Sequence, residues 1–110
     1  MEVKRSTMFE TDGKVGFEVF RSLRRSRVRT EIVMYLYKKY PNASYPAEIA
    51  KETGIDPSNV LGGLRGMGKR FGATDSLLKQ GVVEKVERRD TTYYRLSERG
   101  KTLVESISKA

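Results

Sequence analysis

Helix start and stop signals follow one another closely in the segment 43–60, and this spacing limits the fold more than any other feature of the chain. Pro46 opens a stretch of apolar and polar residues in helical order that Gly54 ends, which predicts a helix of about eight residues. Asp56 and Pro57 then provide an N-cap and a first helical position, so another helix begins within three residues of Gly54. Two helices joined by so short a turn must cross at a steep angle.

Two more helices are predicted ahead of this segment. Phe17, Phe20 and Leu23 recur at three-residue steps, which indicates a short amphipathic helix. A second helix is expected from about Ser26, because apolar residues follow at helical spacing until the Pro-Asn pair that stops it.

A β-hairpin is predicted in the second half of the chain. The runs "VVEKVER" and "TTYYRL" are rich in β-formers and are separated by the dipeptide Arg89–Asp90. With those two residues as the loop, Val83 pairs with Leu96. Neighbouring residues of a strand face opposite ways, so we expect Tyr94 on the core face and Tyr93 on the other.

Turn and cap residues flank the hairpin. The segment "TDSLLKQG" predicts a capped helical turn closed by Gly81, and Ser97 is expected to cap a last helix. That helix has an apolar stripe of Leu103, Val104 and Ile107. The predicted order is therefore helix, helix, short helix, tight turn, helix, β-hairpin and helix.

This order is that of the winged helix-turn-helix, a mainly α fold with a small β-hairpin (α+β). At 110 residues the chain is long enough for one domain, which we expect over 15–110. The first residues show no periodicity, and a flexible N-terminal arm is expected over 1–14.

Composition narrows the function. Lys and Arg number 22 against 14 Asp and Glu, a net charge of +8 that is typical of polyanion binders. The sequence has no Cys and no His, which removes thiolate chemistry and the commonest metal ligand and general base. We therefore expect no enzyme, no catalytic residue, no cofactor and no metal. No signal peptide and no bilayer-length apolar run is present, so a cytoplasmic protein without membrane contact is expected.

Three segments together resemble a known family. They are "SLRRSRVRTEIVMYL", the spacing Ala50-x-x-x-Gly54-x-x-x-x-x-Val60 with Leu64 and Met67 after it, and "GVVEKVERRDTTYYRLSERG". The combined pattern resembles the small winged-helix transcriptional regulators of the ArsR and MarR type, particularly those of archaea. The resemblance implies a homodimeric regulator that binds double-stranded DNA. Its recognition helix, about 57–71, would enter the major groove, and its basic wing would span about 82–96.

The chain departs from this family in two respects. Metal-sensing members carry Cys or His ligands, which this chain does not have, so metal sensing is not implied. In addition, the segment 68–80 is longer than the family usually places between the recognition helix and the hairpin.

The stretch "GGLRGMGKRFG" invites a different interpretation, because Gly63 to Lys69 spells most of a phosphate-binding loop. That motif requires Ser or Thr after the Lys and a buried strand before the loop. Arg70 stands where the motif requires Ser or Thr, and a helix start rather than a strand precedes the glycines, so a phosphate-binding loop is not expected.

As a helix, 57–71 would bury Val60, Leu64, Met67 and Phe71. The predicted DNA-binding residues of this helix and of the wing tip are Ser58, Asn59, Gly62, Arg65, Gly66, Lys69, Arg70, Arg88 and Arg89.

The glycines of this helix allow three explanations, since each Gly in a helix interior costs about 1 kcal/mol relative to Ala. A smooth face could let DNA approach, the same face could pack on a partner helix, or the helix could end early near Gly66 or Gly68. Two rival functions also stay open: an architectural protein that coats DNA without sequence preference, and a protein-interaction module.

Overall fold

The structure is a computed structural model that describes residues 26–66 and 76–109. Within these ranges the chain forms four helices and a two-stranded antiparallel sheet, in the order α2 (Arg27–Lys39), α3 (Pro46–Thr53), α4 (Pro57–Arg65), β1 (Val83–Arg88), β2 (Thr91–Leu96) and α5 (Glu98–Lys109). The predicted α+β class and the order of these elements are confirmed. The expected arm 1–14 and the helix predicted around Phe17, Phe20 and Leu23 lie outside the described residues.

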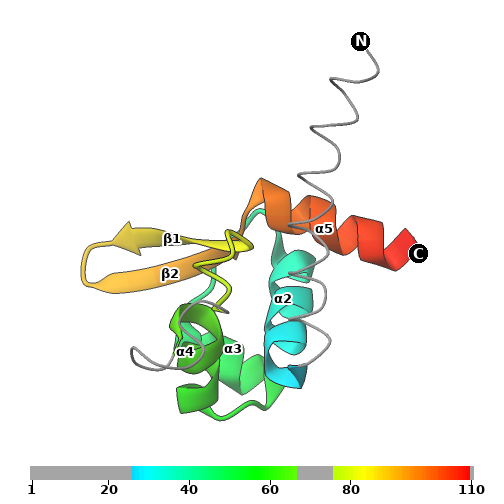
Figure 1. The fold of residues 1–110 in the computed structure, drawn as a ribbon. Helices are drawn as coiled ribbons and strands as arrows, with labels where there is room; N and C mark the ends of the chain where they lie inside the picture. Colours follow the sequence, from blue (N-terminus) through cyan, green and yellow to red (C-terminus); the bar gives the residue numbers. More distant parts are fainter. Residues whose placement is uncertain (1–25, 67–75, 110) are drawn as a thin grey trace.

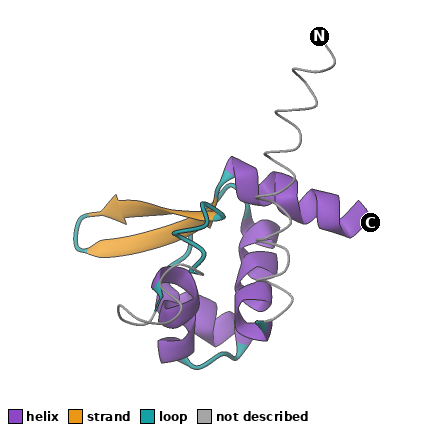
Figure 2. Cartoon of the chain, in the orientation of Figure 1, coloured by secondary structure: helices purple, strands orange, loops and turns teal. Residues whose placement is uncertain are grey.

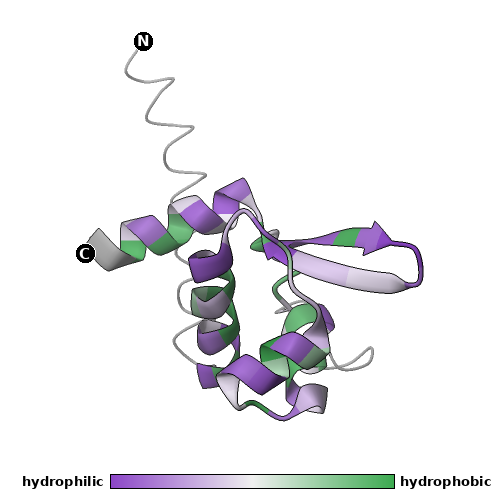
Figure 3. Ribbon diagram, turned by 180° about the vertical axis from the view of Figure 1, so that it is seen from behind, coloured by the Kyte–Doolittle hydropathy of each residue, from purple (hydrophilic) through white to green (hydrophobic). Residues whose placement is uncertain are grey.

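Helix α2 carries the centre of the core. Ser26 caps it, with its hydroxyl oxygen accepting from the backbone N–H of Arg29 at 3.2 Å. Ile32, Val33 and Leu36 are buried along one side of this helix. Figure 3 shows that the hydrophobic stripes of α2 and α5 face the interior of the molecule.

The predicted tight turn between α3 and α4 is confirmed. Gly54 ends α3 in the left-handed region, with φ of 77°, and its N–H donates to the Ala50 carbonyl at 2.8 Å. Asp56 then caps α4, accepting from the Ser58 N–H at 2.9 Å, and Pro57 is the first helical residue. The Pro and Gly signals of the sequence thus place both helix ends.

The predicted extent of α4 was wrong, because the helix ends at Arg65 rather than near residue 71. Gly66 has φ of 90° and ψ of 155°, which no helix accommodates. The carbonyls of Gly63 and Leu64 accept from the N–H groups of Leu77 and Leu78, each at 3.0 Å, instead of from the next turn of a helix. Of the three explanations, an early end near Gly66 therefore holds for that glycine, whereas Gly62 and Gly63 lie inside the helix.

Segment 67–75 lies outside the described residues, and with it the predicted buried positions Met67 and Phe71 and the predicted DNA-binding residues Lys69 and Arg70.

Gly63 allows α4 to approach α2 closely, a role that the amino-acid sequence did not indicate. It is buried, and a β-carbon added there would lie 3.0 Å from Cδ1 of Ile32 and 3.4 Å from Cγ1 of Val28. The distance to Ile32 is shorter than ordinary van der Waals packing, so a larger residue would require the Ile32 side chain to shift.

The hairpin has the predicted register, with Val83 opposite Leu96 and Val86 opposite Tyr93. Tyr94 is buried, at 2% exposure, whereas Tyr93 is half-buried on the other face. Ser44 lies along the free edge of β2, where it exchanges two backbone hydrogen bonds with Tyr94, at 2.8 and 2.7 Å. This bridge joins the hairpin to the chain that enters α3.

The turn before the hairpin and the last helix also agree with expectation. The Ser76 hydroxyl oxygen accepts from the Lys79 N–H at 3.2 Å, and Gly81 has φ of 75°. The Ser97 hydroxyl accepts from the Gly100 N–H at 2.9 Å at the start of α5. Gly100 is buried so tightly that an added β-carbon would overlap the carbonyl oxygen of Val82.

The hairpin extends from the side of the molecule on which α4 lies, and α5 runs away from the hairpin on the other side (Figures 1 and 2). None of the helices described is long and apolar enough to cross a membrane.

Candidate nucleic-acid interface

Helix α4 presents a polar face to solvent. Its buried side consists of Val60, Gly63 and Leu64, which pack toward the core. The exposed residues of this helix include the predicted contacts Ser58, Asn59 and Arg65, together with Leu61. The predicted contacts Gly62 and Gly66 are only half-exposed, and Gly66 lies just beyond the end of the helix.

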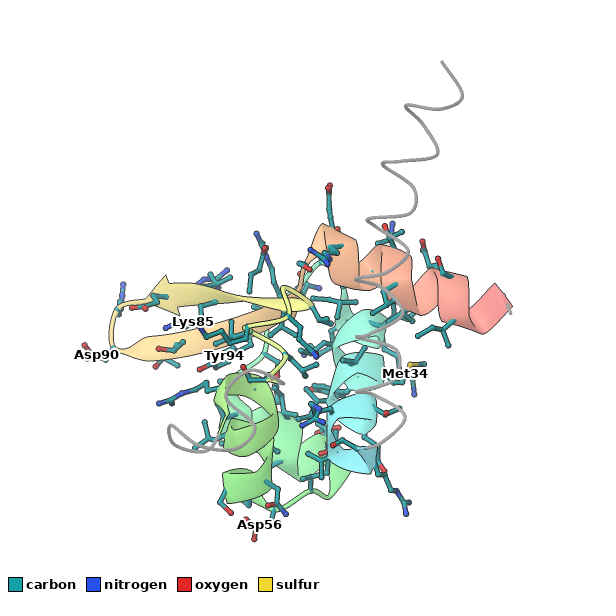
Figure 4. All side chains as sticks on the ribbon, viewed as in Figure 1. Met34, Asp56, Lys85, Asp90 and Tyr94 are labelled. Carbon is teal, nitrogen blue, oxygen red and sulfur yellow. The ribbon has the colours of Figure 1, made fainter. Side chains whose placement is uncertain are left out.

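The two ends of α4 differ in charge. Asp56 lies at its start, far from the hairpin (Figure 4), whereas Arg65 lies at its end. The hydroxyl of Ser58 donates to the Asp56 carboxylate at 2.6 Å, and this bond is the main cause that lowers the pKa of Asp56. Asp56 therefore keeps its negative charge. The Ser58 hydroxyl thus donates to the N-cap carboxylate of α4, a contact that the sequence did not indicate.

The tip of the hairpin carries the two predicted wing arginines, Arg88 and Arg89, both exposed. Arg89 has φ of 52°, a left-handed conformation that Gly or Asn adopts more readily. Arg88 stands differently, since its guanidinium carbon lies 5.4 Å from the centre of the Tyr93 ring. The structure thus brings both arginines to the tip but holds only Arg88 against an aromatic ring.

Lys85 is a cation of this surface that sequence reasoning missed. It lies opposite Tyr94 on the inner face of the hairpin and is exposed (Figure 4). Because side chains alternate along a strand, Lys85 and Arg88 point to opposite faces of β1. The pattern in "VEKVER" places Lys85 opposite Tyr94 on the face of Val83, but it does not indicate that Lys85 is exposed there.

The outer hairpin carries three exposed cations and two exposed acids, Glu87 and Asp90, so its formal charge is slightly positive, whereas charges are paired at its base and on α2. Glu84 and Arg95 form an ion pair at 2.6 Å. Arg27 pairs in the same way with Glu31 at 2.8 Å on α2. The cations of β1 and of the turn lie farther out along the hairpin than the Glu84–Arg95 pair.

The hairpin extends from the helical body on the side where α4 lies (Figure 1). No group of three or more acidic, Cys or His side chains that could hold a metal ion occurs in 26–66 or 76–109. The side chains of this surface include exposed cations, polar groups of α4 and the half-buried ring of Tyr93.

Residues 19–107 match the model of a protein family described as EarA-like. An uncharacterized protein of the archaeon Methanocaldococcus jannaschii is 45% identical over 89 residues, which cover 81% of this chain and 80% of that protein. No solved structure matches the chain. The range matched by the family begins ahead of α2 and ends within α5, so it includes all the residues of the surface described above.

Proposed function

We propose that this chain, which belongs to the EarA-like family, is a DNA-binding transcriptional regulator with a winged helix-turn-helix fold of the ArsR and MarR type. In this proposal α4 is the recognition helix and the hairpin is the wing. The protein would act in the cytoplasm, on double-stranded DNA.

The observation that carries the proposal is the placement of α4 after a tight turn, with its polar face exposed beside a basic hairpin. An α-helix with its side chains is about 10–12 Å across and the major groove is about 12 Å wide, so the exposed face of α4 can enter it. Asn59 and Arg65 have side chains that read adenine and guanine edges in such grooves.

Electrostatics favour the same partner. The net charge of +8 attracts a polyanion, and Lys85, Arg88 and Arg89 place cations on both faces and at the tip of the hairpin. Each phosphate contact releases counterions, so affinity should fall steeply as salt rises.

We further propose that the protein binds as a homodimer on a two-fold symmetric site. Apolar surface is available for a dimer contact, since Met34 on α2 is 41% exposed and Leu103 and Ile107 on α5 are only partly buried. The apolar residues Phe17, Phe20 and Leu23 of the helix predicted ahead of α2, which would add to this contact, lie outside the described residues.

The test is a selection of bound sequences from a random duplex library, followed by titration of the selected duplex and of an unselected one. A regulator prefers the selected duplex at least a hundredfold. Equal affinity for both duplexes would instead identify an architectural protein that coats DNA. The absence of binding to either duplex at low salt would leave the protein-interaction module and refute the proposal.

A further inference from the structure

Three side chains on the outer face of the hairpin form a continuous chain of contacts from helix α3 to the wing tip. Tyr45 contacts Tyr93 with ring centres 5.7 Å apart and planes at 83°, and Tyr93 lies under Arg88. Tyr93 and Arg88 alternate with residues of the opposite, core-facing side, so this row is separate from the buried one formed by Val83, Tyr94 and Leu96.

We infer that Tyr45 and Tyr93 are positioning residues that hold Arg88, and with it the wing tip, in the pose that contacts DNA. This inference rests on the proposed function and deepens it. Neither tyrosine has to touch DNA for the effect, because both act through the guanidinium of Arg88.

Tyr45 is an unusual choice for its position, which is the first argument. It is the N-cap residue of α3, where Ser, Thr, Asp or Asn normally satisfies a free N–H group. Its side chain makes no capping hydrogen bond, and it leaves a large ring 39% exposed. Helix stability alone does not explain this residue, whereas its contact with Tyr93 does.

The mechanics of the hairpin are the second argument. A two-stranded hairpin is marginally stable by itself, and an isolated backbone bridge between Ser44 and Tyr94 joins it to the chain that enters α3. The contact of Tyr45 with Tyr93 lies one residue nearer the tip than this bridge. It therefore supports the hairpin from α3, the partner of α4 in the tight turn.

The chemistry of Arg88 is the third argument. A guanidinium stacked on a ring keeps the N–H groups of its edge available, so Arg88 can bind a phosphate while Tyr93 holds it. A side chain ordered before binding loses less conformational freedom on binding. The expected gain in affinity from this preorganisation is about three- to tenfold.

The experiment uses the full chain and a selected duplex. Tyr45→Ser places a better cap on α3 but removes the ring, so we expect equal or higher thermal stability together with three- to tenfold weaker binding. Tyr93→Leu should weaken binding by a similar factor. The conservative variants Tyr45→Phe and Tyr93→Phe keep the rings and should bind within about twofold of the wild type.

A double-mutant cycle tests whether Tyr93 affects DNA binding through Arg88. In an Arg88→Gln background, Tyr93→Leu should have little further effect, because the side chain that it positions is gone. In the protein without DNA, NMR relaxation at Nε of Arg88 should show a more mobile side chain in both Tyr93→Leu and Tyr45→Ser.

The inference is overturned if Tyr45→Ser and Tyr93→Leu bind the selected duplex like the wild type, or if Arg88 is equally mobile in all the proteins. Failure of the proposed function is a different result, namely that the wild-type protein itself binds no duplex.

Discussion

Replacing Arg89 by glycine should make the protein more stable and at the same time a weaker DNA binder. Arg89 occupies the first position of the two-residue hairpin loop with φ of 52°. Glycine adopts this conformation without steric cost, and hairpin loops of two residues favour it. The residue present is therefore a poor choice for the turn alone.

The size of the stability gain follows from two opposing effects. The left-handed conformation costs an ordinary residue about 1–2 kcal/mol. Glycine loses more freedom on folding, which offsets about 0.5–1 kcal/mol of that gain. We expect Arg89→Gly to raise the free energy of unfolding by about 0.5–1 kcal/mol, or Tm by about 2–8 °C.

The loss in binding follows from the missing charge. Removing one phosphate contact should lower the slope of log K against log salt by about 0.9. It should also weaken binding about tenfold, the equivalent of about 1.4 kcal/mol.

Urea denaturation and fluorescence anisotropy with a labelled duplex measure the two effects. Arg89→Gln is the matched control for the backbone, because it removes the charge but keeps a side chain at positive φ; it should bind weakly without gaining stability. Lys38→Gln removes an exposed charge from the last turn of α2 and should leave both quantities nearly unchanged. Arg89→Gly protein that binds like the wild type would refute the role of the tip. If Arg89→Gly is no more stable than Arg89→Gln, the backbone conformation of residue 89 carries no strain.

Three further predictions concern the fold. Gly100→Ala should lower the free energy of unfolding by about 1–3 kcal/mol in urea, because its β-carbon would overlap a backbone oxygen, and unchanged stability would contradict this packing. Gly62→Ala lies inside α4 and should raise the free energy of unfolding by up to about 1 kcal/mol. Gly66→Ala should lower it by about 1–3 kcal/mol, because Gly66 has a positive φ. Equal effects of the two variants in thermal melts would mean that α4 continues past Arg65. The pKa of Glu48 is lowered, mainly by the hydrogen bond from the Ser44 hydroxyl. The ionised Glu48 carboxylate therefore stabilises the fold above its usual pKa, and this stabilisation is lost as pH falls through the pKa of the folded protein. Urea titrations between about pH 6 and pH 3 should therefore show a shallower loss of stability for Glu48→Gln, and a pH profile identical to that of the wild type would refute the assignment.

Local signals in the sequence were enough for most helix ends and for the hairpin. Gly54 and Asp56 act through their own backbone conformation and side chain, so the turn between α3 and α4 could be predicted from their identity and spacing. The register of the hairpin likewise follows from its two-residue loop.

The end of α4 could not be predicted in this way, because partners distant in sequence decide it. Helical periodicity continues through Met67 and Phe71, but Leu77 and Leu78 return to take the carbonyls that another turn would use. The packing of Gly63 against α2 also depends on residues far along the chain. Periodicity describes a helix by itself and does not contain these contacts.

The candidate interface was predictable in part. The exposed positions of Asn59 and Arg65 and the tip positions of Arg88 and Arg89 follow from helix and hairpin geometry. The contact between Tyr45 and Tyr93 could not be foreseen, because it depends on how the chain before α3 lies along β2.

The central claim, that this basic surface binds duplex DNA through its phosphates and bases, is tested most directly by one salt titration. Binding of the wild-type protein to a labelled duplex is measured from about 50 to 200 mM salt, and log K is plotted against log salt. We predict a straight line whose negative slope corresponds to several phosphate contacts. An affinity that does not change with salt, or no binding at the lowest salt, would contradict the account.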